Sequence, residues 1–312
     1  LETMLFESGG KVLYHTMIAG VETGPDGIES VIVCNKGGLG RLSAKVFIDA
    51  TGDADVSEWS GVGFGMVREQ DGACQPMTMN IRMVNVDIGA VKSYIRSNPD
   101  EFPRLGGDAS IIDRSSRLSV GGFAKTMKKA RESGEISFKR EEILFFETSN
   151  PGEVIVNTTR VLGCEGTDPW SLSGAEIEGR KQALELAGFL KKNVAGFGNA
   201  HVAYTGPCIG IRSTRQIKGL YTLTKDDLLS CRKFDDAIAH SGYPIDIHNP
   251  AGEGTSEKGI RQGDVYGIPY RCLVNGRIGN LITVGRCISA TFEAQAAIRT
   301  TPTAGAIGHA GG

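Results

Sequence analysis

The sequence predicts an α/β protein in which one domain is interrupted by a second domain of mixed α+β structure. Short apolar runs at Lys45–Asp53 and Leu281–Arg286 each reach a glycine beside a charged residue, although more than 200 residues separate them. This pattern is typical of buried parallel strands, which end at the carboxyl edge of an α/β sheet where ligands bind. A β-meander over residues 11–48 leads into the first run. The two runs are therefore expected to belong to one domain.

The meander is predicted from β-rich segments separated by turns. Strands are expected at Lys11–Val21, Ile28–Asn35 and Arg41–Ile48, with turns at 24–27 and 36–40. A short helix from Ala54 to Ser60 follows and ends at Gly61.

The residue pattern of the chain changes near Gln70, where the middle segment begins. Alternating polar and apolar residues predict a strand over 75–84, and a helix of 3.6-residue period is expected from the Ser173 capping box to Val194. The other elements expected between them are helices near 87–97 and 122–133 and a strand hairpin at 143–148 and 154–159.

The last third is expected to return to the first domain. Strands are predicted at 201–205, 210–222, 266–274 and 281–284, and a helix capped by Thr224 at 225–231. Thr301 as N-cap and Pro302 at the first helical position predict a final helix. The simplest organisation is a nucleotide-binding domain of residues 1–69 and 275–312, interrupted by a substrate domain of residues 70–274.

Composition limits the classes of partner. The 312 residues carry a formal net charge of −2 and no block of five like charges, so neither nucleic acid nor an anionic membrane is an expected partner. The longest apolar runs fall short of the roughly 20 residues that span a bilayer. Seven cysteines without a Cys-x-x-Cys pair argue against a disulfide framework and a zinc site, and they fit a reducing, cytoplasmic location. No metal site is expected.

The first candidate site is the strand end Ala50, Thr51, Gly52 and Asp53. A glycine there lets the backbone approach a ligand that a Cβ would exclude. The alternative is an ordinary strand-to-helix turn with Asp53 or Asp55 as N-cap. The aspartate spacing does not match a calcium loop.

The second candidate site joins Gly285 and Arg286 with the start of the last helix at Thr301, Thr303 and Ala304. A helix start favours negative charge, and Arg286 is long enough to reach a phosphate. A solvated loop arginine is the alternative. Glycines at every third position from 305 to 311 suit close packing on a sheet or on a cofactor.

The third candidate set consists of residues expected to bind substrate. Arg212 and Arg215 lie in a predicted strand, where a spacing of three residues places them on opposite faces. One of them is expected to bind an anionic or carbonyl-bearing substrate, and salt bridges with nearby acids are the alternative. His248 lies in a loop-rich stretch, 241–250, which is expected to be either an active-site wall or a structural connection.

Read together, these motifs resemble a bacterial family of FAD-dependent oxidoreductases in the glutathione-reductase-like flavoprotein superfamily. The resemblance implies a Rossmann-like FAD-binding domain and hydride transfer from a small organic substrate to the flavin, with Ala50–Asp53, Gly285, Arg286 and the 301–304 helix start at the cofactor. The matching segments are AKVFIDATGDADV (44–56), QPMTMNIRM (75–83), NTTRVLGCEGTDPWSLSGAEIEGRKQA (157–183), GIRSTRQIKGLYTLTKDDLLSCRKFDDAIA (210–239), YPIDIHNP (243–250), IPYRCLV (268–274) and NLITVGRCISATFEAQAAIRTTPTAGAIGHAGG (280–312).

The sequence departs from that family in two places. The G-x-G-x-x-G turn that holds the FAD pyrophosphate is absent, and Phe292 stands where the family has a histidine. The chain is therefore expected to be a fragment, and these departures argue against FAD binding by the chain as given. The alternatives are a non-redox binding module, or a non-redox enzyme such as a sugar-acting lyase or hydratase. The oligomeric state does not follow from the sequence.

Overall fold

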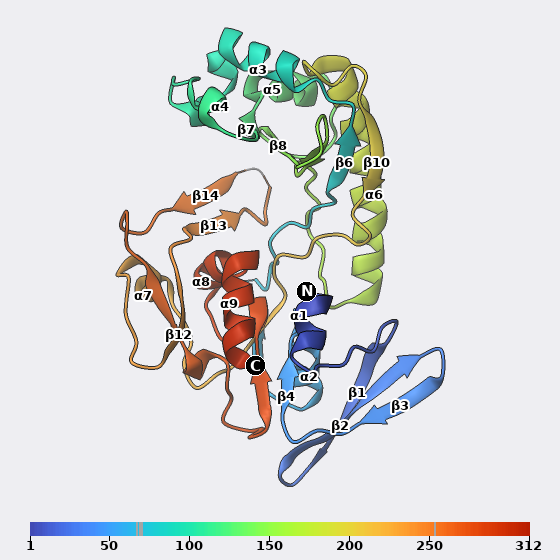
Figure 1. The fold of residues 1–312 in the computed structure, drawn as a ribbon, viewed down its shortest axis with the longest axis vertical. Helices are drawn as coiled ribbons and strands as arrows, with labels where there is room; N and C mark the ends of the chain where they lie inside the picture. The colour runs from blue at the N-terminus through green and yellow to red at the C-terminus, as the bar shows by residue number, and fades with distance from the viewer. Residues whose placement is uncertain (67, 69–70, 253) are drawn as a thin grey trace. The chain divides into compact units, whose positions relative to one another are not determined.

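A computed structural model describes residues 1–66, 68, 71–252 and 254–312 (Figure 1). The chain forms two compact units, each of which combines helices with sheets, so the protein is of the mixed α/β class. Unit 1 comprises residues 1–69, 215–245 and 259–312, and unit 2 comprises residues 70–214 and 246–258. Residues 215–245 and 259–274 thus lie with the chain's two ends rather than with the inserted segment. The predicted boundary at residues 69 and 70 lies outside the described residues.

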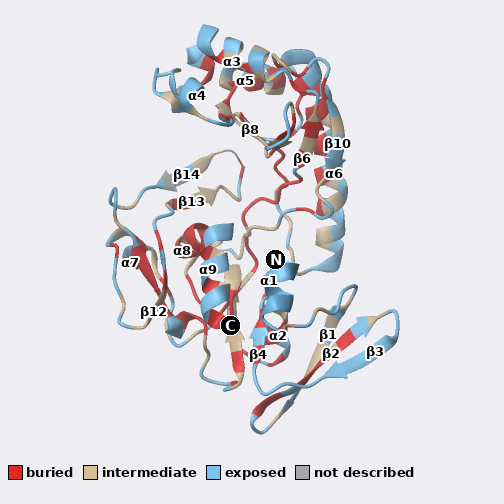
Figure 2. Cartoon of the chain, in the orientation of Figure 1, coloured by how far each residue is buried: buried red, intermediate tan, exposed pale blue. Residues whose placement is uncertain are grey.

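The meander of unit 1 is an antiparallel sheet with the order β1-β2-β3. Its strands are β1 (Met17–Gly24), β2 (Gly27–Asn35) and β3 (Gly38–Leu42). Figure 2 shows buried residues on β2 and an exposed β3. The predicted strand 41–48 is wrong in its bounds, because β3 ends at Leu42 and a separate strand, β4 (Phe47–Asp49), begins after a break.

The strand β4 pairs in parallel with β16 (Leu281–Thr283), with Phe47 opposite Leu281 and Asp49 opposite Thr283. Asn280 joins this pair to the meander: its carbonyl accepts from Phe47 N at 2.9 Å, and its side chain exchanges two hydrogen bonds with the Ile28 backbone. Segments from the two ends of the sequence therefore build one sheet edge.

The predicted burial of the β4 run is correct on one face only. Phe47 and Asp49 are buried, whereas Ile48 between them is 44% exposed. Successive side chains of a strand point to opposite faces. The face of the β4–β16 pair that carries Phe47 and Asp49 is therefore buried, whereas the opposite face is partly exposed.

The helices that border this edge are α2 (Asp55–Trp59), α8 (Phe292–Ile298) and α9 (Thr301–Gly311). The sequence does not predict α8, which begins at Phe292 after the N-cap Thr291. The helix α9 has its N-cap at Thr300, one residue earlier than predicted. The other helices of unit 1 are α1 (Glu2–Glu7) and α7 (Lys225–Leu229), and α7 carries the predicted cap at Thr224.

Several strands in unit 1 are shorter than predicted. β11 (Arg215–Ile217) replaces the strand 210–222 and pairs with β5 (Phe64–Met66). β15 (Tyr266–Pro269) is followed by a 3-10 turn at 270–272 instead of continuing to 274. The last residue of each strand lies opposite the first residue of its antiparallel partner, Ile217 opposite Phe64 and Pro269 opposite Ala237, and local sequence does not encode this limit.

The stretch 241–250 is not the predicted loop. Its first residue belongs to β12 (Ala237–Ser241), which pairs with β15, and residues 245–248 form β13 (Ile245–His248), which pairs with β14 (Thr255–Lys258). His240 is thus a residue of β12 and His248 a residue of β13. These strands form because each pairs with a neighbouring strand. The polar, glycine-containing sequence of the stretch does not indicate that pairing, so the strands could not be predicted from composition.

Unit 2 is built on a five-stranded antiparallel sheet in the order β10-β6-β9-β8-β7. Its strands are β6 (Ile81–Val84), β7 (Ser119–Gly122), β8 (Ile143–Glu147), β9 (Val154–Val156) and β10 (His201–Thr205). Its helices are α3 (Ile88–Ser97), α4 (Ile111–Arg114), α5 (Ala124–Glu132) and α6 (Pro169–Asn193), with 3-10 turns at 99–101 and 103–105. Strand β6 is shorter than the predicted 75–84, because Met77 and Thr78 form isolated bridges to Val161 and Gly210.

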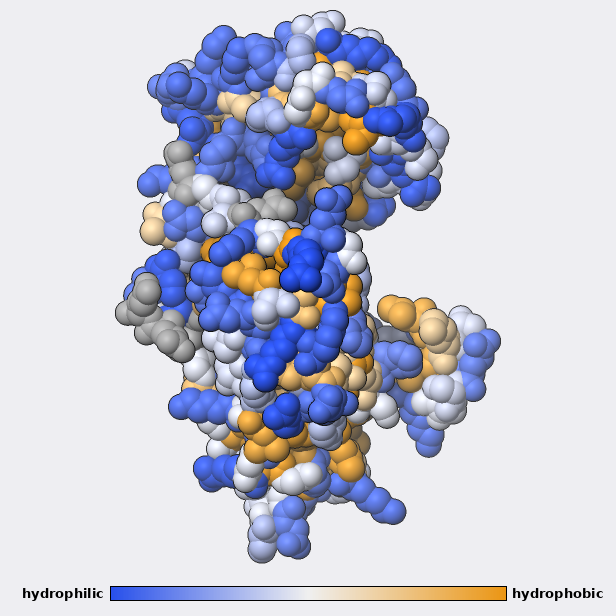
Figure 3. All heavy atoms as spheres, turned by 90° about the vertical axis from the view of Figure 1, so that its left-hand side faces the viewer, coloured by the Kyte–Doolittle hydropathy of each residue, from blue (hydrophilic) through white to orange (hydrophobic). Residues whose placement is uncertain are grey.

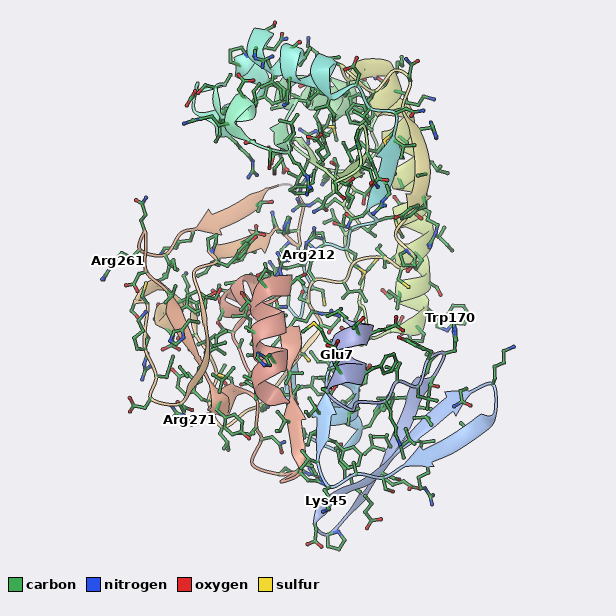
Figure 4. All side chains as sticks on the ribbon, viewed as in Figure 1. Glu7, Lys45, Trp170, Arg212, Arg261 and Arg271 are labelled. Atoms are coloured by element: carbon green, nitrogen blue, oxygen red, sulfur yellow. The ribbon has the colours of Figure 1, made fainter. Side chains whose placement is uncertain are left out.

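The long helix α6 starts earlier than predicted. Asp168 is its N-cap and accepts from Ser171 N at 2.6 Å, and Pro169 occupies the first turn. The Ser173–Glu176 motif therefore lies inside the helix. Trp170 projects from the first turn and is 85% exposed (Figure 4).

Hydrophilic residues cover most of the face drawn in Figure 3, with hydrophobic residues exposed in patches between them. Within the described residues, the structure has no helix whose length and apolar character would suit a membrane crossing.

Candidate functional site

The structure brings the two predicted strand ends of unit 1 into direct contact. Arg286 Nη2 lies 2.8 Å from Asp53 Oδ1 in an ion pair whose side chains are 27% and 17% exposed. The Arg286 guanidinium lies against Gly52, where a Cβ would come within 2.9 Å of Nη1. Gly52 also has φ +84°, a conformation that costs other residues strain. The glycine is therefore required both by its backbone and by its neighbour.

A buried carboxylate fixes the turn that carries Gly52. Asp49 Oδ1 accepts from Thr51 N at 3.1 Å and from Thr51 Oγ1 at 2.7 Å. Asp49 Oδ2 accepts from Ser57 N at 2.8 Å and from Ser57 Oγ at 2.6 Å. Ser57 Oγ also lies 2.8 Å from Thr283 Oγ1 of β16. The last residue of β4 thus ties the turn to both α2 and β16.

Two other predicted residues of this turn have local roles. Thr51 Oγ1 accepts from Asp55 N at 2.9 Å, so Thr51 and Asp49, rather than Asp53 or Asp55, supply side-chain acceptors to the first turn of α2. The N-cap position itself is Ala54, in the left-handed conformation. Ala50 is exposed at the end of β4.

Arg215 is held by the helix that follows this turn. Its guanidinium contacts Asp55 at 2.9 Å and Glu58 at 2.7 Å, and Nη1 donates to the Asp53 carbonyl at 3.1 Å. Burial raises the pKa of Asp55, although the hydrogen bond from Arg215 opposes the shift. Arg215, 12% exposed in its side chain, therefore occupies the salt-bridge role that was the alternative to substrate binding.

The start of α9 borders a cavity of about 420 Å³ within unit 1. No side chain caps this helix start. Thr303 is buried, and its hydroxyl lies 2.9 Å from Ser241 Oγ of β12, while Thr301 is exposed and Ala304 half-buried. The cavity is lined by His240–Pro244, Thr300, Pro302 and Thr303. A helix start whose backbone N–H groups border a cavity favours a ligand with partial negative charge.

The glycines of α9 fall into two groups. A Cβ on Gly311 would come within 2.4 Å of Val284 Cγ1, so this glycine permits close packing of α9 on the end of β16. Gly305 and Gly308 face open space. The sheet-packing interpretation therefore applies to Gly311.

Buried polar atoms near Arg286 test whether these residues suit a cofactor. Among the described residues, Arg286 Nε has no acceptor and Gln216 Oε1 has no donor, although both atoms are enclosed. Gln216 Nε2 donates to the Arg286 carbonyl at 3.3 Å, so the two residues are neighbours. A Cβ on Gly285 (φ +83°) would meet no atom within 4 Å. An unused donor, an unused acceptor and open backbone together fit a ligand with polar oxygen and nitrogen atoms.

The predicted substrate residues Arg212 and His248 lie around one short segment of unit 2. Arg212 (Figure 4) donates to the Pro76 carbonyl, and Gln75 Oε1 accepts from His248 N at 3.2 Å. Gln75 N donates to Ser213 Oγ at 2.9 Å. The structure therefore brings Arg212 and His248 together, whereas Arg215 belongs to unit 1.

His248 is positioned by polar neighbours. Its Nε2 lies 3.5 Å from Asp246 Oδ2, and its Nδ1 lies 3.4 Å from Thr255 Oγ1. The ring is 12% exposed. Within the described ranges, no group of three or more His, Cys, Asp or Glu side chains is placed to hold a metal ion.

Sequence reasoning missed Asp49, Gln216 and Ser57. Asp49 lies inside the first motif, where the sequence pattern predicts only a strand residue. Its burial is explained by the pairing of β4 with β16. Gln216 follows Arg215 without any local signal. These roles arise from contacts between segments far apart in the sequence.

Comparison with known proteins places the whole chain in one family model. The model described as FAD dependent oxidoreductase matches residues 1–312. A search of curated proteins gave no match.

Two solved structures are similar to this chain over nearly its whole length. One is a geranylgeranyl bacteriochlorophyll reductase-like protein from Thermoplasma acidophilum, with 11% identity and a TM-score of 0.42 over 98% of this chain and 48% of that one. The other is L-proline dehydrogenase from P. horikoshii, with 10% identity and a TM-score of 0.40 over 96% of this chain and 50% of that one. The chain spans about half the length of these two structures.

Proposed function

We propose that this chain, which belongs to the FAD-dependent oxidoreductase family, forms the part of a flavoenzyme that receives hydride from a small organic substrate. FAD is the cofactor. The observation that carries the proposal is the parallel pairing of β4 with β16, which joins Gly52–Asp53 to Gly285–Arg286 at one sheet edge. Ligands of open α/β sheets bind beyond the carboxyl ends of the strands.

The residues that would hold FAD are those of the strand ends and of the α9 start. Arg286 offers its unused Nε and Gln216 its unused Oε1 to polar atoms of the cofactor. Gly52 and Gly285 leave room for close backbone approach. The remaining proposed contacts are Ala50, Thr51, Asp53, Thr301, Thr303 and Ala304.

Bound FAD supplies the two-electron chemistry, and the protein adjusts the electrostatics around it. The uncapped start of α9 would favour the extra negative charge of a reduced flavin. Arg286 contacts Asp53 through Nη2, so its remaining N–H groups would be available as charge-assisted donors to the cofactor. Both features would make reduction of the cofactor easier.

Substrate recognition is assigned to Arg212 and His248 of unit 2. Both are anchored through Gln75 and Pro76, so their backbone positions are linked. A guanidinium and an imidazole suit a substrate with a carboxylate or carbonyl oxygen. Arg215 is not retained in this role, because Asp55 and Glu58 engage its guanidinium.

The test is FAD binding by two matched valine variants. Gly52→Val adds a side chain against Arg286, whereas Gly38→Val carries similar backbone strain, at φ +93°, but meets no atom within 4 Å. Lost charge-assisted contacts of about 1.5–3 kcal/mol should weaken FAD binding roughly 10- to 100-fold in the Gly52 variant only. Binding is followed by the visible flavin spectrum of the purified chain titrated with FAD.

Two results would count against this proposal. Equal FAD affinity in the two variants would remove Gly52 and Arg286 from the site. If flavin binds but no organic substrate bleaches its visible band under anaerobic conditions, the hydride-transfer assignment is wrong. Turnover without bleaching would then identify a non-redox enzyme on this scaffold.

A further inference from the structure

Arg140 of unit 2 is a buried cation with an unusual environment. The residue lies between α5 and β8 and is 5% exposed. Among the residues that the structure describes, none forms a hydrogen bond or an ion pair with its guanidinium. Buried arginines are ordinarily paired, because removing an uncompensated charge from water is costly.

The guanidinium is enclosed only at its base. Nε is fully buried and has no hydrogen-bond partner in the described part of the chain. Nη1 and Nη2 also make no hydrogen bond with these residues, but each of them retains some accessible surface. The small accessible surface of this residue therefore includes both terminal amino groups, whose parallel N–H donors match the geometry of a planar oxyanion.

The three acids nearest Arg140 are each engaged elsewhere. Glu142 accepts from Arg104 Nε at 3.0 Å, and Glu141 accepts from the Gly254 backbone. Asp246 lies 3.5 Å from His248 Nε2. These acids act on Arg140 only through space, and burial lowers the pKa of Arg140 against their effect. One positive charge is thus left without a direct partner.

Arg160, the other buried arginine of unit 2, provides a comparison. It is 2% exposed, and its Nη2 donates to the Asn249 carbonyl at 3.2 Å and to the Gly254 carbonyl at 2.8 Å. Arg160 therefore pins the turn that follows β13. Arg140 has no such structural contact.

We propose that Arg140 binds a carboxylate of a small organic molecule through its two terminal amino groups. The inference rests on the proposed function, in which this molecule is the substrate. A carboxylate is favoured over a phosphate, because Glu141, Glu142 and Asp246 act on the same guanidinium and would repel a doubly charged anion more strongly than a singly charged one.

The first test is protection of Arg140 from phenylglyoxal, mapped by mass spectrometry of the full chain's peptides. Sodium acetate is the probe, acetamide its uncharged analogue, and sodium chloride sets equal ionic strength. Acetate should slow modification of Arg140 by roughly twofold at its dissociation constant and roughly tenfold at ten times that concentration. Arg114, an exposed arginine paired with Asp108 at 3.3 Å, serves as the internal control and should react equally in all solutions.

Two results of this experiment would overturn the inference. Equal protection by acetate and acetamide, or none by either, would exclude an anion site. Stronger protection by inorganic phosphate than by acetate would exclude the carboxylate assignment.

The second test is thermal unfolding of Arg140→Met, Arg140→Lys and the control Arg114→Met. Loss of a buried charge that makes no hydrogen bond or ion pair with the described residues should leave the Tm of Arg140→Met unchanged or raised, while the acetate-induced rise in Tm disappears. Arg140→Lys should retain part of that rise. A lower Tm in Arg140→Met without acetate would show that the arginine is structural. Neither readout involves flavin, so failure of the hydride-transfer proposal and failure of this one are distinguishable.

Discussion

Replacement of Asp49 by asparagine tests how strongly one buried carboxylate holds the turn at the proposed cofactor site. The carboxylate is fully buried and accepts four hydrogen bonds, two from Thr51 and two from Ser57. An asparagine of the same shape must present its amino group to one of these pairs. The hydroxyls can rotate away, but the backbone N–H of Thr51 or Ser57 then faces another donor.

The expected cost follows from this geometry. A buried backbone donor without a partner costs about 1–3 kcal/mol, and loss of the charge from the remaining hydrogen bonds adds about 1–2 kcal/mol. Asp49→Asn should therefore destabilise unit 1 by about 2–5 kcal/mol. The FAD site should weaken with it, because the same turn carries Gly52 and Asp53.

The assay is urea unfolding followed by tryptophan fluorescence. The two tryptophans lie in different units, Trp59 in α2 of unit 1 and Trp170 in α6 of unit 2. In a Trp170→Phe background, fluorescence reports on the unit that contains Asp49. Trp170 is 85% exposed, so this background change should be close to neutral.

The control is Asp108→Asn. Asp108 also accepts from a following serine, with Ser110 N at 2.9 Å and Ser110 Oγ at 2.5 Å, but it lies in solvent. Water can replace these contacts, so no measurable change is expected. Because Asp108 belongs to unit 2, this variant is followed through Trp170 in a Trp59→Phe background. A loss below about 1 kcal/mol in Asp49→Asn would refute the role assigned to the carboxylate.

Two further predictions concern charged groups of unit 1. Arg215→Met leaves two carboxylates of α2 without their shared cation, so it should lower the free energy of unfolding, measured in urea, by roughly 1–3 kcal/mol. The control Arg41→Met removes an exposed ion pair and should cost less than about 1 kcal/mol. Equal losses in the two variants would contradict this reasoning. Burial by itself would raise the pKa of Asp227, but hydrogen bonds from Thr224 and others lower it overall, so its stabilising contribution is present above the usual aspartate pKa and is lost as pH falls through the folded value. Asp227→Asn should therefore flatten the fall in unfolding free energy between about pH 5 and about pH 3, and an unchanged slope would exclude this residue as its source.

Elements with strong local signals were predictable. The turn at residues 24–27 separates β1 from β2 as expected, and the Thr224 cap starts α7 as expected. Strand ends and α8 were not predictable. β11 ends with its partner β5, and the interior of α8 is almost wholly buried and therefore lacks an amphipathic period.

Gly52 and Gly285 were predictable as proposed cofactor contacts, because a glycine at the end of a strand is a recognisable local pattern. Gln216, Asp49 and Arg140 have none. Each is defined by what surrounds it: a neighbouring arginine, four donors, or the lack of any partner among the described residues. The same residue types in solvent would carry no functional meaning.

The sequence by itself determined the α/β class, the two glycine-ended strands and the family resemblance, because these depend on local pattern and on the order of motifs along the chain. Only the tertiary structure decided that β4 and β16 are parallel neighbours and that Arg286 lies against Gly52. It also decided that Arg215 pairs with Asp55 and Glu58, while Arg140 is unpaired among the described residues. Burial and charge pairing depend on distances in space, and those distances are set by segments far apart in the sequence.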